Sequence, residues 1–514
     1  MIDAATLWDL VAQRAAATPD REFLVDESGR TLTFAEFCGT AEEVAAGLHD
    51  RGIGDGTVVS WQLPTWIEAT VLVAALSRLG TVQNPLVPIY RRREVGFILG
   101  QIEPDLYIGP STWRDFDYQA MVAELAPGLE RFVVEAGTAD VALPRGDPAT
   151  LPPVPAAPGD PAAAPVRYLC YTSGTTSEPK GARHTEATVL HGARVNTTGV
   201  GYAADDTVIM IFPFTHVGGT MILESILEVG ARLVLTDVFA PDHTSELIKR
   251  FGVTVAPGAP PIHQAFVAVN RARPDDRLFE TVRAYPSGGT PIPPALFHEV
   301  KDELGGSGII SGYGLTEAPL LTMGRTTDST EQLANTEGRP GAGVELRFLR
   351  EDGTECGPGE EGEIRARGPQ VMRGYYDASL DEDAFDAEGW FCTGDLGRRD
   401  GDGYVTITGR LKDVIIRKAE NVSAQEVEHV LYTHPKVGDI AVVGLPDEDT
   451  GERVCAVVVT AEGADALTFD EMADHCKAAG LMMQKIPEQL EIVDALPRNN
   501  TGKVMKFLLV EQFS

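Results

Sequence analysis

A strand-like stretch at residues 58–63 is followed by an apolar helical stretch at residues 65–79 and a second strand-like stretch at residues 81–84. Gly80 stands where the helical pattern stops, a position at which glycine often ends a helix. The same alternation recurs at residues 207–212, 221–228 and 232–235. A repeated order of strand, helix and strand favours helices packed on mainly parallel sheets. The fold class is therefore expected to be α/β.

The chain also contains signals for a second, smaller domain. Its 514 residues exceed the length that one hydrophobic core usually supports. Two capping boxes, Thr33 with Glu36 and Ser423 with Glu426, mark helix starts, and strands are expected at residues 440–443 and 454–460. The Pro- and Ala-rich stretch 143–166 is expected to be a surface connector. We expect a large domain at residues 1–409 and a small α+β domain at residues 410–514.

Composition narrows the class of protein. Hydrophobic residues make up 43% and charged residues 23% of the chain, which is typical of a globular protein. The formal net charge of −33 argues against binding to nucleic acid or to anionic membranes, because both carry phosphates. The six cysteines are scattered without metal-binding spacing, so we interpret them as reduced thiols. With no signal-peptide pattern and no integral membrane segment in the sequence, a cytoplasmic protein is expected.

A loop at residues 171–181 has the composition of a phosphate site. It reads YTSGTTSEPKG and follows a strand-like stretch at residues 166–170. Glycine lets the backbone approach phosphate closely, the amides and hydroxyls donate hydrogen bonds, and the lysine supplies positive charge. The sequence is not a Walker A loop, and for this stretch alone a surface turn with a solvated lysine remains open. The expected nucleotide-binding residues here are Thr172, Ser173, Gly174, Thr175, Thr176 and Lys180.

This loop resembles the signature of the adenylate-forming superfamily, which includes acyl-CoA synthetases, adenylation domains of peptide synthetases and luciferases. Further matches follow in the family's order: FPFTH (212–216), SGGTP (287–291), YGLTE (313–317), GRP (338–340), GEI (362–364), TGD (393–395), GR (409–410) and PRNNTGK (497–503). Chance does not account for so many ordered matches. One departure is Ser177, where the family usually has glycine. The resemblance implies a small β subdomain within the large domain and a mobile C-terminal domain.

The resemblance also implies roles for single residues. Tyr313, next to Gly314, would stack on adenine, Thr316 would bind the α-phosphate, and Glu317 would hold Mg²⁺, a hard cation that prefers oxygen ligands. The adenine slot would be lined by Gly288, Gly289 and Thr290. Asp395 would accept both ribose hydroxyls and Arg410 would add a contact, while His216 would flank the acyl channel. Taken singly, such charged residues are more often helix caps or surface ion pairs.

Lys503 is the residue that the resemblance places at the first chemical step. A carboxylate must approach the α-phosphate of ATP, and one like-charge contact at about 4 Å costs about 4 kcal/mol at an effective dielectric near 20. An ammonium between the two anions would offset that repulsion and stabilise developing charge, an effect worth roughly 3–4 kcal/mol. In isolation Lys503 would be interpreted as a flexible C-terminal lysine.

The implied function is that of an ATP-dependent acid–thiol ligase. It would convert a carboxylic acid to acyl-CoA through an acyl-adenylate, releasing pyrophosphate and AMP, with ATP, Mg²⁺ and coenzyme A as cofactors. Lys412 would be the pivot about which the small domain rotates between the two steps. Lys418, where many relatives have glycine, would meet coenzyme A phosphates after that rotation.

Three other functions stay open: transfer of the acyl group to a carrier protein, a non-catalytic relative, and oxidation as in luciferase. Against an amino-acid activating module, no acid stands near His216 to bind an α-amine, and the sequence ends soon after Lys503 without a carrier domain. The acid could be fatty, aromatic, alicyclic or steroid-derived. A homodimer is also left open, as is an acetyltransferase acting on Lys503, because related synthetases are acetylated within this motif.

Overall fold

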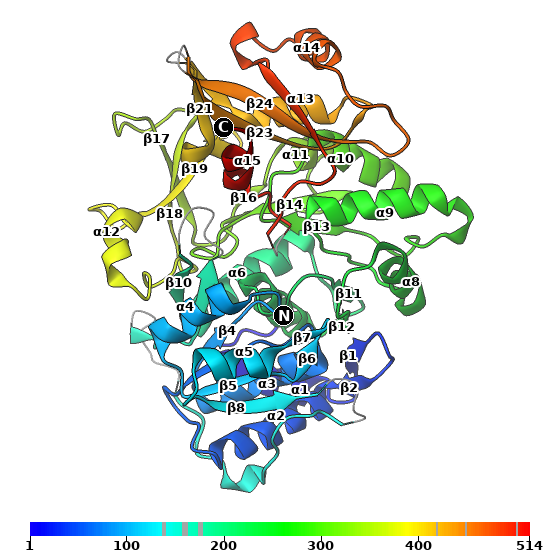
Figure 1. Ribbon diagram of the computed structural model, residues 1–514. Helices are drawn as coiled ribbons and strands as arrows, with labels where there is room; N and C mark the ends of the chain where they lie inside the picture. The colour runs from blue at the N-terminus through cyan, green and yellow to red at the C-terminus, as the bar shows by residue number, and fades with distance from the viewer. Residues whose placement is uncertain (136–139, 157–162, 173–177, 418–419, 448–449, 500–501) are drawn as a thin grey trace.

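A computed structural model describes residues 1–514 except 136–139, 157–162, 173–177, 418–419, 448–449 and 500–501 (Figure 1). One sheet has six strands in the order β10-β9-β4-β3-β5-β8. Neighbours in this sheet are parallel except β9 and β10, which form an antiparallel pair around the predicted phosphate loop. The strands are β3 Val58–Trp61, β4 Val82–Pro85, β5 Leu106–Pro110, β8 Glu130–Val134, β9 Tyr168–Thr172 and β10 Lys180–His184.

A second sheet has the order β11-β12-β1-β2, and β11, β12 and β1 are parallel. A third has the order β13-β14-β15-β16. Val255 forms parallel bridges with both Val208 in β11 and Ala284 beside β13, so the carboxyl ends of β11, β13 and β14 share one edge. The strands are β1 Glu22–Asp26, β2 Thr31–Thr33, β11 Thr207–Met210, β12 Arg232–Leu235, β13 Tyr285–Gly288, β14 Ile309–Tyr313, β15 Thr322–Met323 and β16 Arg339–Pro340.

Helices pack on these sheets, and the predicted unit at residues 58–84 is confirmed as β3, α3 and β4. All residues of α3 (Ile67–Leu79) are buried, as expected for a mainly apolar helix in a core, and its charged residues Glu68 and Arg78 are buried with it. It ends at Gly80, whose φ of 71° is in the left-handed region that glycine favours. The other helices of this part are α1 Leu7–Ala17, α2 Phe34–His49, α4 Arg92–Ile102, α5 Tyr118–Leu125, α6 Glu186–Val200, α7 Val217–Val229, α8 Pro241–Phe251, α9 Pro260–Ala272, α10 Pro294–Glu299, α11 Thr330–Asn335 and α12 Asp381–Ala384.

An antiparallel sheet, on the left of Figure 1, corresponds to the expected small β subdomain. Its strands are β17 Glu345–Leu349, β18 Gly362–Arg367, β19 Phe391–Arg399 and β20 Val405–Arg410. A hydrophobic cluster that includes Ile364 and Val405 forms its core. Strand β20 ends at Arg410, where the chain passes through a short turn into the C-terminal part.

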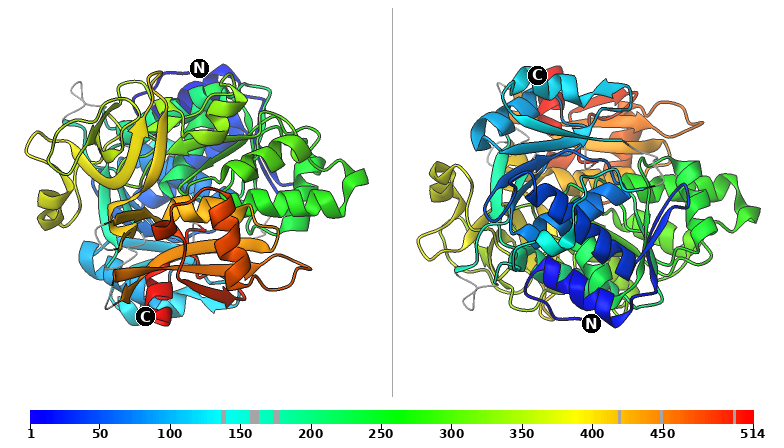
Figure 2. Two further views of the ribbon diagram at one scale, coloured as in Figure 1. Left: turned by 90° about the horizontal axis from the view of Figure 1, so that it is seen from above. Right: turned by 90° about the horizontal axis from the view of Figure 1, so that it is seen from below.

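The C-terminal part has a sheet and hydrophobic clusters of its own. It lies at the top of Figure 1, and in front of the other elements when seen from above (Figure 2). The strands predicted at residues 440–443 and 454–460 lie within β23 and β24. Its elements are β21 Val414–Arg417, β22 Glu420–Ser423, α13 Ala424–Tyr432, β23 Val437–Asp447, β24 Gly451–Thr460, α14 Phe469–Ala478, β25 Gln489–Val493 and α15 Lys506–Phe513.

Several predicted helices and strands begin or end at other residues in the structure. The helix predicted at 221–228 begins earlier, at Val217, because the His216 side chain caps it and Gly218-Gly219 interrupts the apolar pattern. The preceding strand ends at Met210 rather than at residue 212. The Thr33 capping box is complete, whereas at Ser423 the structure has the side-chain cap to the Glu426 amide. The described residues of 143–166 include a short 3₁₀ turn, Pro148–Thr150.

The described residues also allow two plain statements about membrane crossing and about the cysteines. None of the helices in the described part of the chain has the length and apolar content that a membrane crossing needs. All six cysteines, each of which lies in a described range, are free thiols as predicted.

Gly338, in the GRP motif, provides a test of this packing. Its φ is 77°, and a Cβ there would overlap the backbone of Met323 and Gly324. We expect Gly338→Ala to lower the free energy of unfolding by about 2–5 kcal/mol, combining left-handed strain with overpacking. Gly353→Ala is the matched control, because Gly353 has φ 79° with no atom within 4 Å of a new Cβ. Equal shifts of the calorimetric melting temperature in both variants would contradict the steric explanation.

Candidate functional site

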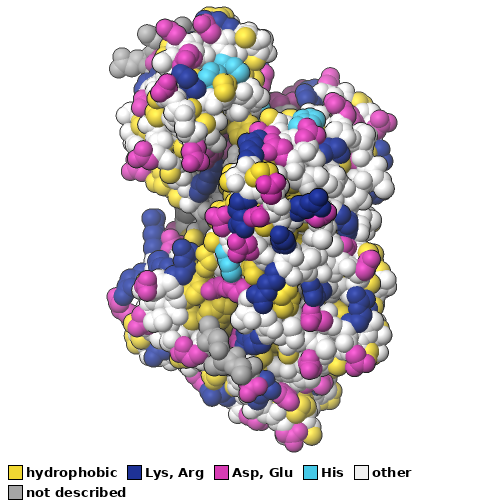
Figure 3. Space-filling view, turned by 90° about the vertical axis from the view of Figure 1, so that its right-hand side faces the viewer, with side chains coloured by type: hydrophobic (Ala, Val, Ile, Leu, Met, Phe, Trp, Pro, Cys, Tyr) yellow, Lys and Arg dark blue, Asp and Glu magenta, His cyan; other side chains and the backbone are white. Residues whose placement is uncertain are grey.

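A cavity of about 630 Å³ lies between the carboxyl ends of strands β13 and β14 and the C-terminal part. In the space-filling view the upper lobe is separated from the body by an indentation (Figure 3). Seven of the predicted nucleotide-binding and catalytic residues line this cavity, as does the predicted pivot Lys412: Gly289, Thr290, Tyr313, Gly314, Asp395, Arg410 and Lys503. The structure thus brings together residues that are distant in sequence. Glu317, Thr316, Lys180, Thr172, Gly288 and His216 are not among the lining residues.

Two strand ends supply the glycines of this cavity. Gly288 in β13 pairs with Gly312 in β14, and Gly289 follows with φ 81° and open space beside its Cα. At Gly314 a Cβ would overlap the backbone of Leu320, so this position admits glycine alone. Because parallel strands bring their carboxyl ends to one edge, such loops commonly form ligand sites. The result is a narrow region of exposed backbone that could admit a flat ring.

Asp395 is held by two partners at the wall of the cavity. It lies in β19 directly opposite Arg410 in β20, and its Oδ1 is 2.7 Å from Arg410 Nε. The Tyr313 hydroxyl donates a hydrogen bond of 2.8 Å to Oδ2. A carboxylate has about four acceptor sites, so both oxygens can still accept from a ligand such as a diol. These two contacts fix the orientation of the carboxylate.

Tyr313 contributes its hydroxyl as well as its ring. Burial, and next the Asp395 charge, raise the pKa of Tyr313 well above its usual value, so the hydroxyl stays protonated and donates. The residue is 8% exposed and belongs to the hydrophobic cluster of the β subdomain. The sequence had suggested stacking on adenine but gave no sign of the contact with Asp395.

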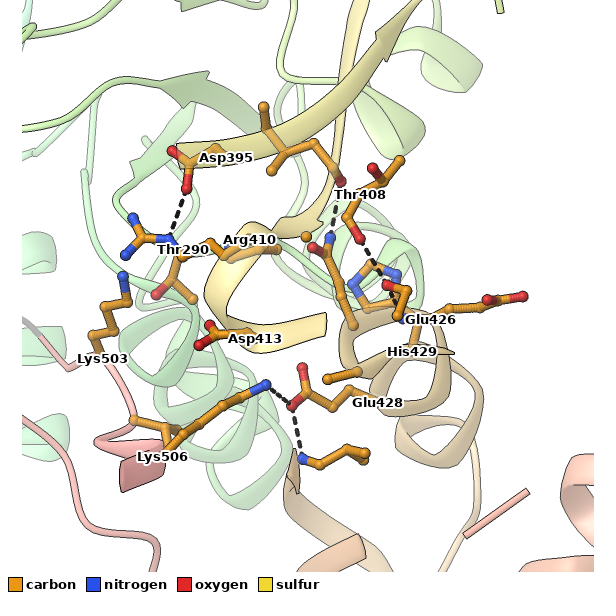
Figure 4. A pocket seen from close by; sticks show the side chains of 18 of the residues that line it. Thr290, Asp395, Thr408, Arg410, Asp413, Glu426, Glu428, His429, Lys503 and Lys506 are labelled. Carbon is orange, nitrogen blue, oxygen red and sulfur yellow. Dashed lines mark hydrogen bonds and ion pairs between the residues drawn. The ribbon is translucent and has the colours of Figure 1, made fainter. Parts of the chain in front are cut away.

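Lys503 reaches the cavity on a tight turn between β25 and α15. Its backbone N–H donates to Asn499 Oδ1 (2.9 Å), and Gly502 before it has φ 82°. Arg498 anchors the turn to β23 through two hydrogen bonds to Asp439, of 2.8 and 2.7 Å. Figure 4 shows Lys503 pointing toward the part of the cavity that holds Arg410 and Thr290.

Lys503 loses its proton more readily than an ordinary lysine. Burial, and next the positive charge of Arg410, lower the pKa of the Lys503 ammonium to about 8. Lys412 acts in the same direction, whereas the carboxylates of Asp395 and Asp413 oppose the shift. A second cationic group therefore lies close to the Asp395–Arg410 pair, as a site for an anionic ligand would require.

Of the predicted phosphate-binding residues, Thr172 and Lys180 lie in the described ranges, one near the start and one near the end of the loop. Thr172 and Lys180 pair across β9 and β10, and the Lys180 ammonium lies 5.4 Å from the centre of the Tyr375 ring. The predictions for Ser173, Gly174, Thr175 and Thr176, and the departure at Ser177, fall on residues outside the described ranges, as does Lys418.

Thr316 and Glu317 are held by two residues that sequence reasoning missed. The Glu317 carboxylate accepts a 2.8 Å hydrogen bond from the Tyr375 hydroxyl. The Thr316 carbonyl lies 2.7 Å from Nε2 of His184. The only sequence signals for them were the strand-like residues after Lys180 and the short RGYY stretch at 373–376.

His216 makes a structural contact at the start of α7. Its Nδ1 accepts the Gly218 N–H (3.1 Å), and burial lowers its pKa to about 4. The imidazole is therefore neutral at physiological pH. Its place beside an acyl channel stays a prediction.

No group of three or more His, Cys, Asp or Glu side chains in the described ranges is arranged to hold a metal ion. The role of Glu317 as a single carboxylate ligand stays a prediction. That role is compatible with Mg²⁺, which commonly takes one or two protein carboxylates and completes its shell with phosphate oxygens and water.

The family model described as "AMP-binding enzyme" matches residues 11–376, and that of the "AMP-binding enzyme C-terminal domain" matches residues 426–503. The chain belongs to the AMP-binding enzyme family. This AMP-binding enzyme is accordingly an adenylate-forming acid ligase with the α/β fold of that superfamily.

Two relatives of this AMP-binding enzyme differ in their named acceptors. It is 33% identical to a medium-chain fatty-acid–CoA ligase of Escherichia coli, over 98% of this chain and 90% of the relative. It is also 33% identical to a salicyl-AMP ligase / salicyl-S-ArCP synthetase of Mycobacterium tuberculosis, over 99% of this chain and 90% of the relative. A solved structure, o-succinylbenzoate CoA synthetase of Bacillus subtilis with ATP and magnesium, is similar at TM-score 0.82 and 27% identity, covering 97% of this chain and 98% of that one.

Tyr375 supplies a test of how Glu317 is held. Tyr375→Phe removes the hydroxyl that donates to the carboxylate. Hydrogen bonds to charged groups contribute about 1.5–3 kcal/mol, so we expect a roughly 10-fold higher Mg²⁺ concentration for half-maximal adenylation. Tyr376→Phe is the neighbouring control, since Tyr376 is 41% exposed. Identical Mg²⁺ titrations of the two variants would count against a role for Tyr375.

The pKa of Lys503 predicts a pH profile. With a pKa of about 8, deprotonation should lower kcat/KM for ATP tenfold per pH unit above that value. The pKa of Lys503 in the protein without ligand is the relevant one, because the pH dependence of kcat/KM reports ionisations of the free enzyme. Lys503→Arg keeps its charge at these pH values and should lack this descending limb, whatever its absolute activity. The same limb in both enzymes would assign it to another group.

Proposed function

We propose that this protein is an AMP-forming acyl-CoA synthetase. It would convert a carboxylic acid and coenzyme A to acyl-CoA through an acyl-adenylate, with release of pyrophosphate and AMP. The observation that carries the proposal is the entry of Lys503 into the cavity that holds Asp395 and Arg410. That arrangement supports a site for a nucleotide with a mobile cation at its reactive end.

In this proposal each part of the cavity meets one part of ATP. Asp395 accepts the ribose hydroxyls, Arg410 contacts the ribose or a phosphate, and adenine enters beside Tyr313. The adenine slot is completed by Gly288, Gly289, Thr290 and Gly314. Thr316 and the loop that ends at Lys180 bind phosphates. Glu317 supplies an oxygen ligand for Mg²⁺, which suits a hard cation.

The first step is displacement at phosphorus. A carboxylate oxygen of the acid forms a bond to the α-phosphorus, and the bond from that phosphorus to the bridging oxygen breaks, so pyrophosphate leaves. Lys503 would lie between the acid and the α-phosphate, where its charge offsets their repulsion. No nucleophile from the protein is needed.

The second step is thiolysis. The sulfur of coenzyme A attacks the acyl carbon, the bond to AMP breaks, and the thiol proton passes to solvent. We propose that residues 410–514 move as a domain about Lys412 between the steps, which would withdraw Lys503 and bring Lys418 toward coenzyme A phosphates. Few polar contacts oppose such a movement among the described residues; examples are Gln264 Nε2 to Tyr432 Oη (2.7 Å) and Ser423 Oγ to the Thr408 carbonyl (2.7 Å).

A second candidate is transfer of the acyl group to a carrier protein. The likeness to a ligase whose name includes an aryl carrier protein favours it. Both candidates share adenylation and differ in the thiol that accepts the acyl group. We propose a cytoplasmic location for either, supported by the six free cysteines.

The two candidates are separated by a panel of fatty, aromatic, alicyclic and steroid carboxylates. We expect one class of acid to give ATP-dependent pyrophosphate release, and coenzyme A to turn the adenylate into a thioester. Pyrophosphate release that never yields a coenzyme A thioester would favour a carrier protein. No release with any acid would refute both.

Lys503→Ala tests the proposed cation. We expect adenylation to slow by roughly 100- to 1000-fold, because charge stabilisation in a transition state is worth about that much. Thiolysis of a preformed adenylate should be spared, and acetylation of Lys503 should act like the substitution. Lys506→Ala is the control, since Lys506 lies on the same tail but pairs with Glu428 at 2.8 Å. Full-speed adenylation by Lys503→Ala would refute the mechanism.

A further inference from the structure

The turn that carries Thr316 and Glu317 is closed by its own backbone. The Leu321 N–H donates to the Tyr313 carbonyl (2.7 Å), and Leu315 and Ala318 exchange two hydrogen bonds of 3.1 Å. Leu320 adopts a left-handed φ of 52°, a strained conformation for a residue other than glycine. These contacts determine the shape of the turn. They do not determine where the turn lies relative to the predicted phosphate loop.

His184 connects the turn to the strand that leaves that loop. Strand β10 begins at Lys180 and ends at His184, which is fully buried. Nε2 of the ring is 2.7 Å from the Thr316 carbonyl, and Nδ1 is 3.1 Å from the Thr188 hydroxyl on α6. One rigid side chain therefore joins strand β10, the first turn of α6 and the turn at Thr316.

The partners of the ring define its protonation. A carbonyl only accepts hydrogen bonds, so Nε2 carries the proton that points to Thr316. Burial lowers the pKa of His184 to about 4, so the ring is neutral and Nδ1, without a proton, can only accept a hydrogen bond from the Thr188 hydroxyl. Thr188 Oγ1 also lies 2.8 Å from the Thr185 carbonyl, to which it could donate instead. The contact with Thr316 is thus the one that requires a donor from His184.

We propose that His184 is a positioning residue for adenylation: its Nε2–H holds the Thr316 carbonyl, and with it the Thr316–Glu317 turn, in register with strand β10 and Lys180. The ring itself touches no substrate, because it is fully buried. A parallel contact supports this arrangement, since the Met372 N–H donates to the Glu317 carbonyl (2.8 Å) and residue 373 pairs with Arg183 of β10. The inference rests on the proposed function through its first step, adenylation.

Four substitutions separate positioning from packing. His184→Gln places an amide N–H near Nε2 and retains a donor for Thr316, whereas His184→Asn is too short and retains only a partner for Thr188. His184→Leu keeps the apolar volume and removes both hydrogen bonds. Thr188→Val is the matched control, because it removes the Nδ1 contact and leaves the Thr316 contact.

The measurement is acid-dependent exchange between pyrophosphate and ATP, with thermal melting of each variant as the check on folding. Misplacement by about 1 Å can lower a rate by a factor of 100. We therefore expect kcat to fall roughly 10- to 100-fold in His184→Asn and in His184→Leu, with KM for ATP within about threefold of the parent protein. His184→Gln and Thr188→Val should keep kcat within about threefold.

Equal kcat values in the Gln and Asn variants, or a more active Asn variant, would overturn the proposal. If the Asn variant does not fold, the Leu variant is compared with the Gln variant instead. An unchanged kcat in the Leu variant would also overturn the proposal. The exchange assay needs no thiol. If the acceptor is not coenzyme A, the synthetase proposal would be refuted, but this test of His184 would still be valid. A parent protein that shows no exchange with any acid would overturn both.

Discussion

The ion pair of Asp395 with Arg410 is the contact around which this site is organised. It joins two antiparallel strands, β19 and β20, at the point where β20 leads into the C-terminal part. A buried carboxylate is costly unless it is paired, and Asp395 is 2% exposed. Arg410 and the Tyr313 hydroxyl meet that requirement from two different sheets. The pair therefore fixes the relation between the β subdomain, the edge of the parallel sheet and the start of the C-terminal part.

Lys503 is the most mobile element of the mechanism that we propose, and its environment explains why its charge matters. Burial, and next the neighbouring cations Arg410 and Lys412, lower its pKa, while Asp395 and Asp413 raise it. Binding of a polyanion would shift this balance toward the charged ammonium, because opposite charge favours the charged form. Binding of the anionic ligand would thus keep Lys503 protonated. An overall charge of −33 makes such local donors necessary for an anionic substrate.

Much of this fold could be predicted from local patterns, and the failures have a common cause. The unit of β3, α3 and β4 follows from apolar periodicity and from Gly80, which are properties of neighbouring residues. The early start of α7 escaped prediction because His216 caps it through a side-chain contact. His184 and Tyr375 were missed because their partners are 132 and 58 residues away, and neither residue forms a motif by itself. The ordered motifs indicated which residues belong to the family site, but the supports of those residues depend on tertiary contacts.

The anchoring of the lysine turn has a consequence for how this enzyme could be controlled. Arg498 ties the turn to β23, the last strand in the order β22-β21-β24-β23, so Lys503 is attached to the sheet of the C-terminal part. A movement of the C-terminal part would therefore carry Lys503 with it. A molecule wedged beneath that part, far from any nucleotide contact, would keep the ammonium out and stop catalysis without competing with ATP.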